Sequence, residues 1–226
     1  MWFAGPLRRV PDSGRPQALR LGFSLAPGMR VGLYGGSFNP VHDGHVQVAR
    51  TALARLRLDR VIWLVTPGNP LKAKQSAADL SERMAAVRKV ATGPSMIVSG
   101  LEAKTGSAFS ADTIRILQAR FPEVHFVWLM GADNLAGFHR WRGWPQIIRR
   151  IPVAVLARPG SALSGLSSPA TRRFAHARRP LSQAARLALA MPPAWIYLPM
   201  PLNPQSSTAI RAQRSRELVG ARSETP

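Results

Sequence analysis

Two histidines lie close together in a glycine-rich segment near the start of the sequence, GGSFNPVHDGH at residues 35–45. Gly35 and Gly36 allow a sharp turn and a close approach of the backbone to a ligand. His42 and His45 stand three residues apart where a helix is expected to begin, so both side chains can face the same space. Imidazole donors and the free N–H groups of a helix N-terminus bind phosphate. The histidines could instead bind zinc, although the chain has no cysteine and a third ligand would have to come from elsewhere.

A second segment with phosphate-binding chemistry lies near the other end of the chain, PLNPQSSTAIR at residues 201–211. Ser206, Ser207 and Thr208 stand where a last short helix is expected to begin, and they offer hydroxyls and free N–H groups. Arg211 follows one turn later on the same face. Hydroxyls, a helix N-terminus and a guanidinium together predict a second phosphate site. A serine cap beside a solvated arginine would leave the same pattern.

A shorter polar segment, GADN at residues 131–134, follows an apolar run. Gly131 permits a tight turn, and Asp133 at the start of the next helix can accept hydrogen bonds from ribose hydroxyls. Asp133 could equally serve only as a helix N-cap.

The strands and helices expected around these segments predict where the segments lie in the fold. Strands are expected at six short apolar runs, at 30–34, 60–66, 95–99, 124–130, 152–157 and 195–198. Such uniformly apolar strands are typical of a parallel sheet that is covered on both faces. Amphipathic stretches at 45–58, 80–91 and 111–120 alternate with them. Asp79 is expected to cap the second of these helices, in a capping box with Glu82, and Ser110 to cap the third.

This alternation predicts an α/β fold: a Rossmann-like, doubly wound and mainly parallel sheet with helices on both faces, in a single domain. Ligands of such folds bind outside the carboxyl ends of the strands. We therefore expect the histidine segment and GADN at one edge of the sheet.

The composition narrows the class of protein. The chain has 226 residues, 46% of them apolar, and no cysteine, which excludes disulfides and thiol nucleophiles. Its formal net charge of +20 would attract phosphates, nucleotides, nucleic acid or an anionic membrane, or it reflects arginines spread over solvated faces. No apolar run is long enough to span a membrane.

We expect the folded domain at residues 29–214. Residues 1–28 are basic and interrupted by prolines, which indicates either a flexible leader or a start codon placed too early. Residues 158–180 are predicted to form a basic loop, and residues 215–226 a polar tail.

Together, GGSFNPVHDGH and SSTAIR resemble the paired signatures of the nucleotidyltransferase superfamily that shares an HxGH motif with class I aminoacyl-tRNA synthetases. Within it, the chain is similar to the bacterial nicotinate-nucleotide adenylyltransferases. TPGNPLK at 66–72, GADN at 131–134 and RWRGW at 140–144 stand where that family has them. The resemblance covers about residues 29–214.

The resemblance implies a cytoplasmic enzyme of NAD biosynthesis. It would join nicotinate mononucleotide to ATP with Mg²⁺, giving deamido-NAD and pyrophosphate. The phosphate of the mononucleotide would attack the α-phosphorus directly, without a covalent enzyme intermediate. ATP and nicotinate mononucleotide are then the expected partners, with no resident metal site, no stable nucleic-acid partner and no membrane, while monomer or homo-oligomer stays open.

The same resemblance implies the functional residues. Catalysis would rest on His42, His45 and Arg211. The implied ATP site is Gly35, Gly36, Ser37, Phe38, His42, His45, Gly131, Asp133, Ser207, Thr208 and Arg211. The implied nicotinate mononucleotide site is Ser37, Phe38, Lys72, Thr105, Gly106, Phe109 and Trp141, with the indole stacked on the pyridine ring.

One segment departs from the family pattern. The family has Ser-Tyr-Thr before an Asp-Thr pair, and this chain has Ala108, Phe109 and Ser110 there. Phe109 keeps the ring but loses the hydroxyl, which leaves the preference for acid over amide substrate open.

Other functions fit parts of the pattern. Another HxGH nucleotidyltransferase could act on nicotinamide mononucleotide or pantetheine phosphate. A class I synthetase is disfavoured because KAKQS at 72–76 follows the second strand and the chain lacks room for a tRNA-binding domain. The charge also allows a nucleic-acid-binding protein on an inactive nucleotide fold.

Overall fold

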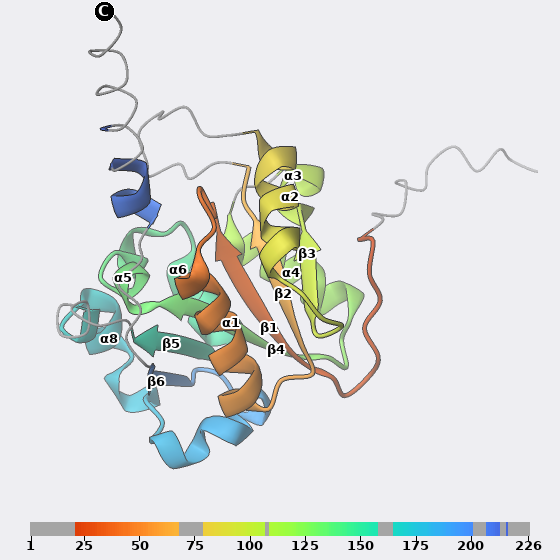
Figure 1. Ribbon diagram of the computed structural model, residues 1–226. Helices are drawn as coiled ribbons and strands as arrows, with labels where there is room; N and C mark the ends of the chain where they lie inside the picture. The colour runs from red at the N-terminus through yellow and green to blue at the C-terminus, as the bar shows by residue number, and fades with distance from the viewer. Residues whose placement is uncertain are drawn as a thin grey trace, which may run out of the picture.

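The computed structural model describes residues 21–67, 79–106, 109–157, 165–200, 207–212 and 216. Its strands form one six-stranded sheet in the order β3-β2-β1-β4-β5-β6 (Figure 1), and every neighbouring pair is parallel. The strands are β1 (Arg30–Gly36), β2 (Arg60–Val65), β3 (Met96–Ser99), β4 (His125–Gly131), β5 (Val153–Ala157) and β6 (Trp195–Pro199). The prediction of a parallel α/β sheet is confirmed, and each predicted strand lies within two residues of its observed bounds.

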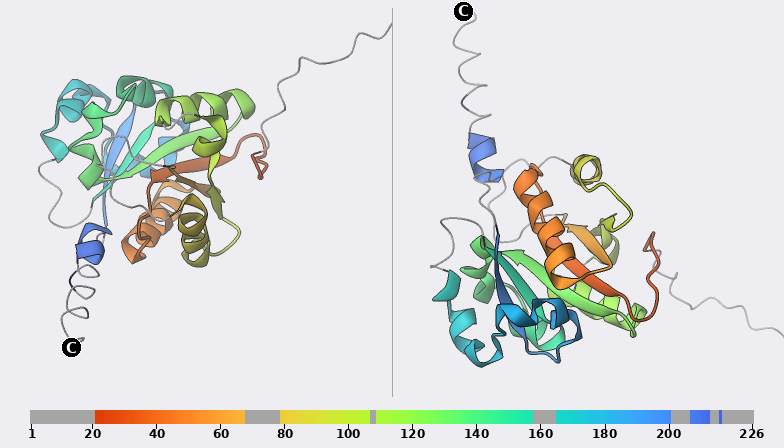
Figure 2. Two further views of the ribbon diagram at one scale, coloured as in Figure 1. Left: turned by 90° about the horizontal axis from the view of Figure 1, so that it is seen from above. Right: turned by 60° about the horizontal axis from the view of Figure 1, so that its bottom comes forward.

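Helices cover both faces of the sheet, as Figure 2 shows from above. They are α1 (Asp43–Leu56), α2 (Leu80–Val90), α3 (Leu101–Thr105), α4 (Ser110–Arg120), α5 (Ala132–Leu135), α6 (Trp144–Arg150) and α8 (Pro169–Arg173), with 3₁₀ segments η1 (Phe138–Arg140), η2 (Ala175–Ala177) and η3 (Leu181–Leu189). Successive strand residues alternate between two cores. One core packs against α4, α6 and α8, and the other against α1, α2 and η3.

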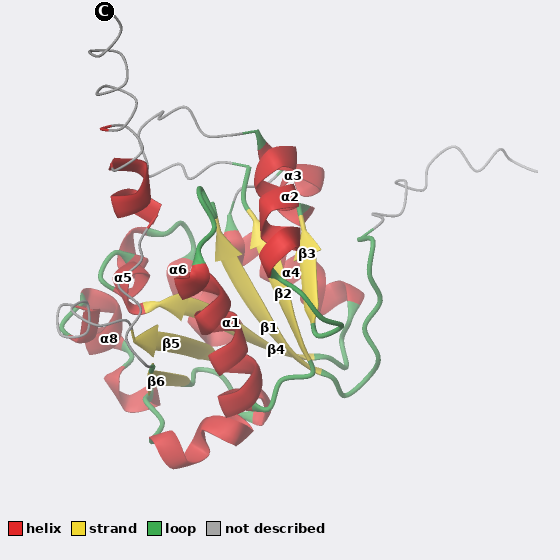
Figure 3. Ribbon diagram, viewed as in Figure 1, coloured by secondary structure: helices red, strands yellow, loops and turns green. Residues whose placement is uncertain are grey.

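The strand order reverses at the centre of the sheet. The chain runs from β1 through β2 to β3 on one side, then crosses to β4, β5 and β6 on the other. Because every neighbouring pair is parallel, the carboxyl ends of all six strands lie at one edge of the sheet, and the twist of the sheet fans the arrows out in Figure 3. The loops after β1 and β4 therefore leave from adjacent strand ends, which is where doubly wound sheets bind ligands.

Of the two predicted helix N-caps, one is present and the other is not. Asp79 caps α2 as expected, because its carboxylate accepts a hydrogen bond from the Ser81 N–H at 3.3 Å. Ser110 is not a cap: it is the first residue of α4, and Phe109 occupies the N-cap position without a side-chain hydrogen bond.

The prediction of a loop at residues 158–180 was wrong over its second half, where α8 and η2 form. The signal was local: the Ser168 hydroxyl accepts from the Thr171 N–H, and Pro169 stands in the first turn. Phe174 is buried against the sheet, and its carbonyl accepts from the Trp195 indole at 2.7 Å. Residues 158–164 lie outside the described part of the chain.

The packed part of the chain also begins earlier than residue 29. Leu21 is buried, the Phe23 ring stacks on Phe121 at 6.1 Å, and the Gly28 N–H donates to the Glu123 carbonyl at 2.8 Å. Arginines and prolines dominate residues 1–28, so the sequence did not indicate that these few apolar residues pack against the domain. None of the helices in the described ranges is long and apolar enough to cross a membrane.

The close packing of β1 against β4 gives a first prediction. A Cβ on Gly35 would lie 2.7 Å from the Trp128 ring, so Gly35→Ala should lower the free energy of unfolding by about 1–3 kcal/mol. Gly137→Ala is the matched control, because nothing lies within 4 Å of its added Cβ. Chemical denaturation measures both variants, and equal stability of the two would contradict this packing.

Candidate active site at the carboxyl edge of the sheet

The loop after β1 brings both histidines to the N-terminus of α1. His42 is the N-cap residue, with an extended backbone (φ −151°, ψ 170°). Its backbone N–H donates to Nδ1 of His45 at 3.3 Å, and the two ring centres are 3.9 Å apart. His42 is buried and His45 is half-buried. The predicted convergence of the two side chains is therefore present.

This hydrogen bond determines which nitrogen of His45 carries the proton. Nδ1 accepts from the backbone, so the neutral imidazole has its hydrogen on Nε2. His45 consequently presents an N–H donor from Nε2, which suits an anionic oxygen.

Phe38 supports the loop from below. It has a left-handed backbone (φ 46°) and is only 2% exposed. Its ring makes edge contacts with His45 at 5.1 Å and with Tyr34 at 5.3 Å, and lies 5.2 Å from Trp63. The sequence predicted Phe38 in both nucleotide sites, but with its ring in the core only its backbone can contact a ligand.

The C-terminal helical residues 207–212 lie against the same loop (Figure 1). The Ser207 hydroxyl donates to the Pro40 carbonyl at 2.9 Å, across 167 positions of sequence. Arg211 donates to the carbonyl of Asn39 and, from Nη2, to the Thr208 hydroxyl at 3.3 Å. The two segments predicted to bind phosphate are thus in direct contact.

Arg83 is a residue of this region that the sequence prediction missed. It comes from α2, is only 4% exposed, and donates to the carbonyls of Ser37 at 2.8 Å, Thr66 at 2.7 Å and Pro67 at 3.1 Å. Burial lowers the pKa of the Arg83 guanidinium, and the nearby Asp79 carboxylate partly offsets this. Arg83 therefore ties the loop after β1 to the loop after β2. In the sequence, the burial of Arg83 is indicated only by its position four residues before Val87, which places both residues on the same face of the helix.

The loop after β4 forms a second part of the site. Gly131 is buried at the strand end, and Asp133 is exposed on α5. Trp141 is partly exposed, and its ring meets Trp128 edge-on at 6.2 Å. Because Trp128 also packs against Gly35, core contacts connect Trp141 to the end of β1.

The segment between α3 and α4 contains the residues expected near the pyridine ring. Gly106 ends α3 in a left-handed conformation, and Phe109 precedes α4. The Thr105 hydroxyl donates to the Glu102 carbonyl at 3.1 Å, so it is not ready to donate to a ligand. Lys72, Ser206 and Ala108 lie outside the described residues.

Glu102 is a buried acid beneath this segment. It is 1% exposed, and its Oε1 accepts from the Thr113 hydroxyl at 3.4 Å. Its Oε2 has no hydrogen-bond partner among the described residues. Burial raises the pKa of Glu102 from 4.5 to about 7, while the bond from Thr113 lowers it. A neutral carboxyl is thus favoured at this position.

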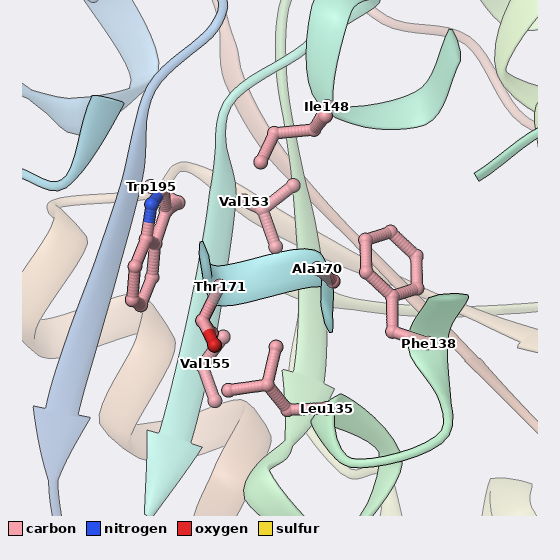
Figure 4. A pocket seen from close by; sticks show the side chains of 8 residues that line it. All are labelled: Leu135, Phe138, Ile148, Val153, Val155, Ala170, Thr171 and Trp195. Atoms are coloured by element: carbon pink, nitrogen blue, oxygen red, sulfur yellow. The ribbon is translucent and has the colours of Figure 1, made fainter. Parts of the chain in front are cut away.

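One apolar cavity lies between β5, β6, α8 and the segment that follows β4 (Figure 4). Its lining is Leu135, Phe138, Ile148, Val153, Val155, Ala170, Thr171 and Trp195. The Thr171 hydroxyl is engaged with the Leu166 and Ser168 carbonyls at 2.9 and 2.8 Å. The cavity offers a phosphate no donor, so the candidate site is at the strand ends.

The groups gathered at that edge are chemically suited to binding an anion. Imidazoles, hydroxyls, a guanidinium and a helix N-terminus converge on one loop, and an exposed aspartate and a tryptophan follow the neighbouring strand. Among the residues that the structure describes, no three His, Cys, Asp or Glu side chains gather to hold a metal ion.

Comparisons with known proteins point to the same chemistry. A family model described as cytidylyltransferase-like matches residues 33–213. A protein of Caulobacter sp. (strain K31) named "Probable nicotinate-nucleotide adenylyltransferase" is 60% identical over 188 residues, which are 83% of this chain and 100% of that protein. A protein of Methylorubrum extorquens with the same name is 54% identical over 185 residues, 82% of this chain and 100% of that protein.

A solved structure shares the fold. Plasmodium falciparum nicotinic acid mononucleotide adenylyltransferase, complexed with NaAD, superposes with a TM-score of 0.60 at 12% identity. The match covers 81% of this chain and 83% of that one.

The Arg83 contacts predict a strong effect on stability. Arg83→Met would remove the donor from three part-buried hydrogen bonds and should lower the free energy of unfolding by about 2–4 kcal/mol. The Thr66 amide, which donates to Gly36 at 3.0 Å, should exchange its hydrogen faster. Arg88→Met, at an exposed position of the same helix, is the control and should change stability by less than about 0.5 kcal/mol. If the two variants behave alike, Arg83 does not hold the loops.

The buried Glu102 predicts a pH dependence of stability. The folded chain favours the neutral Glu102 carboxyl. The stabilisation that this preference gives to the folded state is complete below the ordinary pKa of 4.5, and it is lost as the pH rises through the folded-state pKa of about 7. Relative to Glu102→Gln, wild type should lose roughly 1–3 kcal/mol of unfolding free energy between about pH 4.5 and pH 8. Denaturant titrations across this range measure the difference, and parallel curves would contradict the assignment.

Proposed function

The chain belongs to the nicotinate-nucleotide adenylyltransferase family, and on this premise we propose how its residues carry out the reaction. The enzyme transfers the adenylyl group of ATP to nicotinate mononucleotide, forming deamido-NAD and pyrophosphate in NAD biosynthesis. The names of relatives up to 60% identical over their whole length support this substrate pair. They also make an amide-specific or pantetheine-phosphate enzyme the weaker alternative.

The chemical step is an in-line displacement at the α-phosphorus. A phosphate oxygen of the mononucleotide forms the new P–O bond, and the bond from the α-phosphorus to the bridging oxygen breaks. Pyrophosphate leaves with that oxygen. The attacking oxygen is already an anion, so no strong base is needed. Catalysis then rests on positioning and on neutralising charge.

His45 and His42 would contact the phosphates nearest the reacting atom. The Nε2–H of His45 is the donor we assign to the α-phosphate, because its tautomer is set by the bond from His42. The N-terminus of α1, with its positive dipole end, adds favourable potential at the same place.

Arg211, Ser207 and Thr208 would bind the β- and γ-phosphates. A guanidinium has five N–H donors, and contacts with Asn39 and Thr208 hold that of Arg211 in place. Ser207 is held against Pro40 in the same way. When the nucleotide binds, its phosphate oxygens would accept hydrogen bonds from these donors, either in addition to the loop carbonyls or in their place.

Residues of the neighbouring loops would bind the rest of both substrates. We assign the pyridine ring to Trp141, ribose hydroxyls to Asp133 and backbone contacts to Ser37 and Phe38. Lys72 remains a proposed partner of the mononucleotide phosphate.

Magnesium is expected to arrive with the triphosphate. The phosphate-binding side chains are N–H and O–H donors, whereas Mg²⁺ takes oxygen ligands. We propose that phosphate oxygens and water hold the ion, which would supply positive charge beside the leaving pyrophosphate. We also place the reaction in the cytoplasm, where ATP is available.

The docking of residues 207–212 on the histidine loop is the observation that supports this reading most strongly. Neither segment alone points beyond a single phosphate. Side by side, they provide enough donors for a triphosphate.

The mechanism predicts a large loss of turnover in His45→Ala. Purified wild type with Mg²⁺, ATP and nicotinate mononucleotide should release pyrophosphate, and His45→Ala should lower kcat about 10²–10³-fold while folding normally. A coupled pyrophosphate assay and circular dichroism measure the two properties.

His125→Ala is the control, because this exposed histidine starts β4 at the opposite edge of the sheet. It should keep wild-type turnover. Equal turnover in His45→Ala and wild type would refute the role of His45, whereas an inactive wild type would refute the function itself.

A further inference from the structure

We propose that the side chain of Arg142 selects the acid form of the mononucleotide, by attracting the carboxylate of a nicotinate ring stacked on Trp141. This inference rests on the proposed function and specifies how one substrate is recognised. It assigns a task to a residue that the sequence pattern left without one.

The proposal starts from a contact between two loops. The Arg142 guanidinium lies over the Phe109 ring, 4.5 Å from its centre. The next residue brings the backbones together as well, since a Cβ on Gly143 would lie 3.1 Å from Cβ of Ala111. The turn at 141–143 is therefore packed against the N-terminal end of α4. Both loops belong to the carboxyl edge of the sheet.

The position of Arg142 places a charge close to the expected ring. Arg142 follows Trp141 directly, so their Cα atoms are only about 3.8 Å apart. Trp141 is partly exposed. The rings of Trp128 and Phe138 pack against its indole, with ring centres 6.2 and 5.4 Å away. A planar ligand on the open part of this indole would lie next to the turn that carries Arg142.

The side chains of the other described candidates near this segment offer a carboxylate little, so beyond backbone N–H groups a charged donor has to come from another residue. The Thr105 hydroxyl already donates to the Glu102 carbonyl. Phe109 has no hydroxyl, and Gly106 has no side chain. The acid and the amide differ by a full negative charge, so a cation distinguishes them more strongly than neutral donors do.

Stacking on Phe109 suits Arg142 to this task. A guanidinium held on an aromatic face keeps its planar donors oriented, so less side-chain freedom is lost when an anion binds. Arg142 is exposed, so an anion can approach it from solvent. The ring of Phe109 thereby acts as a platform for the cation, which gives the loss of the hydroxyl a physical role.

Stacking alone would not justify the proposal, because this chain stacks arginines elsewhere. Arg149 lies over Phe174 at 5.9 Å, and Arg173 over Trp144 at 5.5 Å. Arg149 is in the last turn of α6. It provides a matched control: an exposed arginine with the same kind of contact, away from Trp141.

The test compares acid and amide substrates. The kcat and KM of wild type, Arg142→Gln, Arg142→Lys and Arg149→Gln are measured with nicotinate and with nicotinamide mononucleotide at saturating ATP and Mg²⁺. Arg142→Gln should raise KM for the acid about tenfold or more, the size expected for a hydrogen bond to a charged group. Its KM for the amide and both kcat values should stay within about twofold of wild type. Arg142→Lys should restore most of the acid preference.

The acid-to-amide ratio of kcat/KM distinguishes the outcomes. The ratio should fall about tenfold in Arg142→Gln and stay unchanged in Arg149→Gln. An unchanged ratio in Arg142→Gln, or equal losses with both substrates, would overturn the inference and leave Arg142 as a packing residue. A wild type that makes no dinucleotide from either substrate would overturn the proposed function and this inference together.

Discussion

The parallel pairing of β1 with β4 at the centre of the sheet determines where the functional segments lie. On either side of this pair the chain proceeds in opposite directions, so the loops that follow the two strands separate and leave room for a ligand. Gly35 lets Trp128 pack against the β1 backbone, and Trp128 contacts Trp141. The same core side chains thus support the loop that we propose binds phosphate and the turn that we propose binds the pyridine ring.

A site that binds a polyanion needs donors that are held in place before the ligand arrives. The loop after β1 is held from several sides. Phe38 packs beneath it, and Arg83 donates to its Ser37 carbonyl. Ser207 donates to its Pro40 carbonyl, and Arg211 donates to its Asn39 carbonyl. The Arg83 contact also extends to the loop after β2. The net charge of +20 adds a favourable field for nucleotides, and local geometry provides the specificity.

Most of the fold could be predicted from the sequence, because buried parallel strands are continuous apolar runs and the first two long helices carry clear polar and apolar faces. The pairing of the two phosphate-binding segments came from a resemblance, since no local rule brings residue 42 to residue 211. Tertiary features escaped prediction. Arg83 looks like an ordinary helix charge, Phe38 like an exposed loop residue, and the Arg142 contact with Phe109 depends on how two separate loops pack. The short helix α8 was missed although Ser168 and Pro169 signalled it.

The central claim is that the converging donors stabilise a single direct transfer and that no side chain becomes a nucleophile. The stereochemical course of the reaction tests this most directly. ATP made chiral at the α-phosphorus would be converted with nicotinate mononucleotide, and the configuration of the dinucleotide determined by ³¹P NMR. Inversion at phosphorus is the predicted result, because one in-line displacement inverts the centre. Retention would reveal a covalent adenylyl-enzyme and contradict the account.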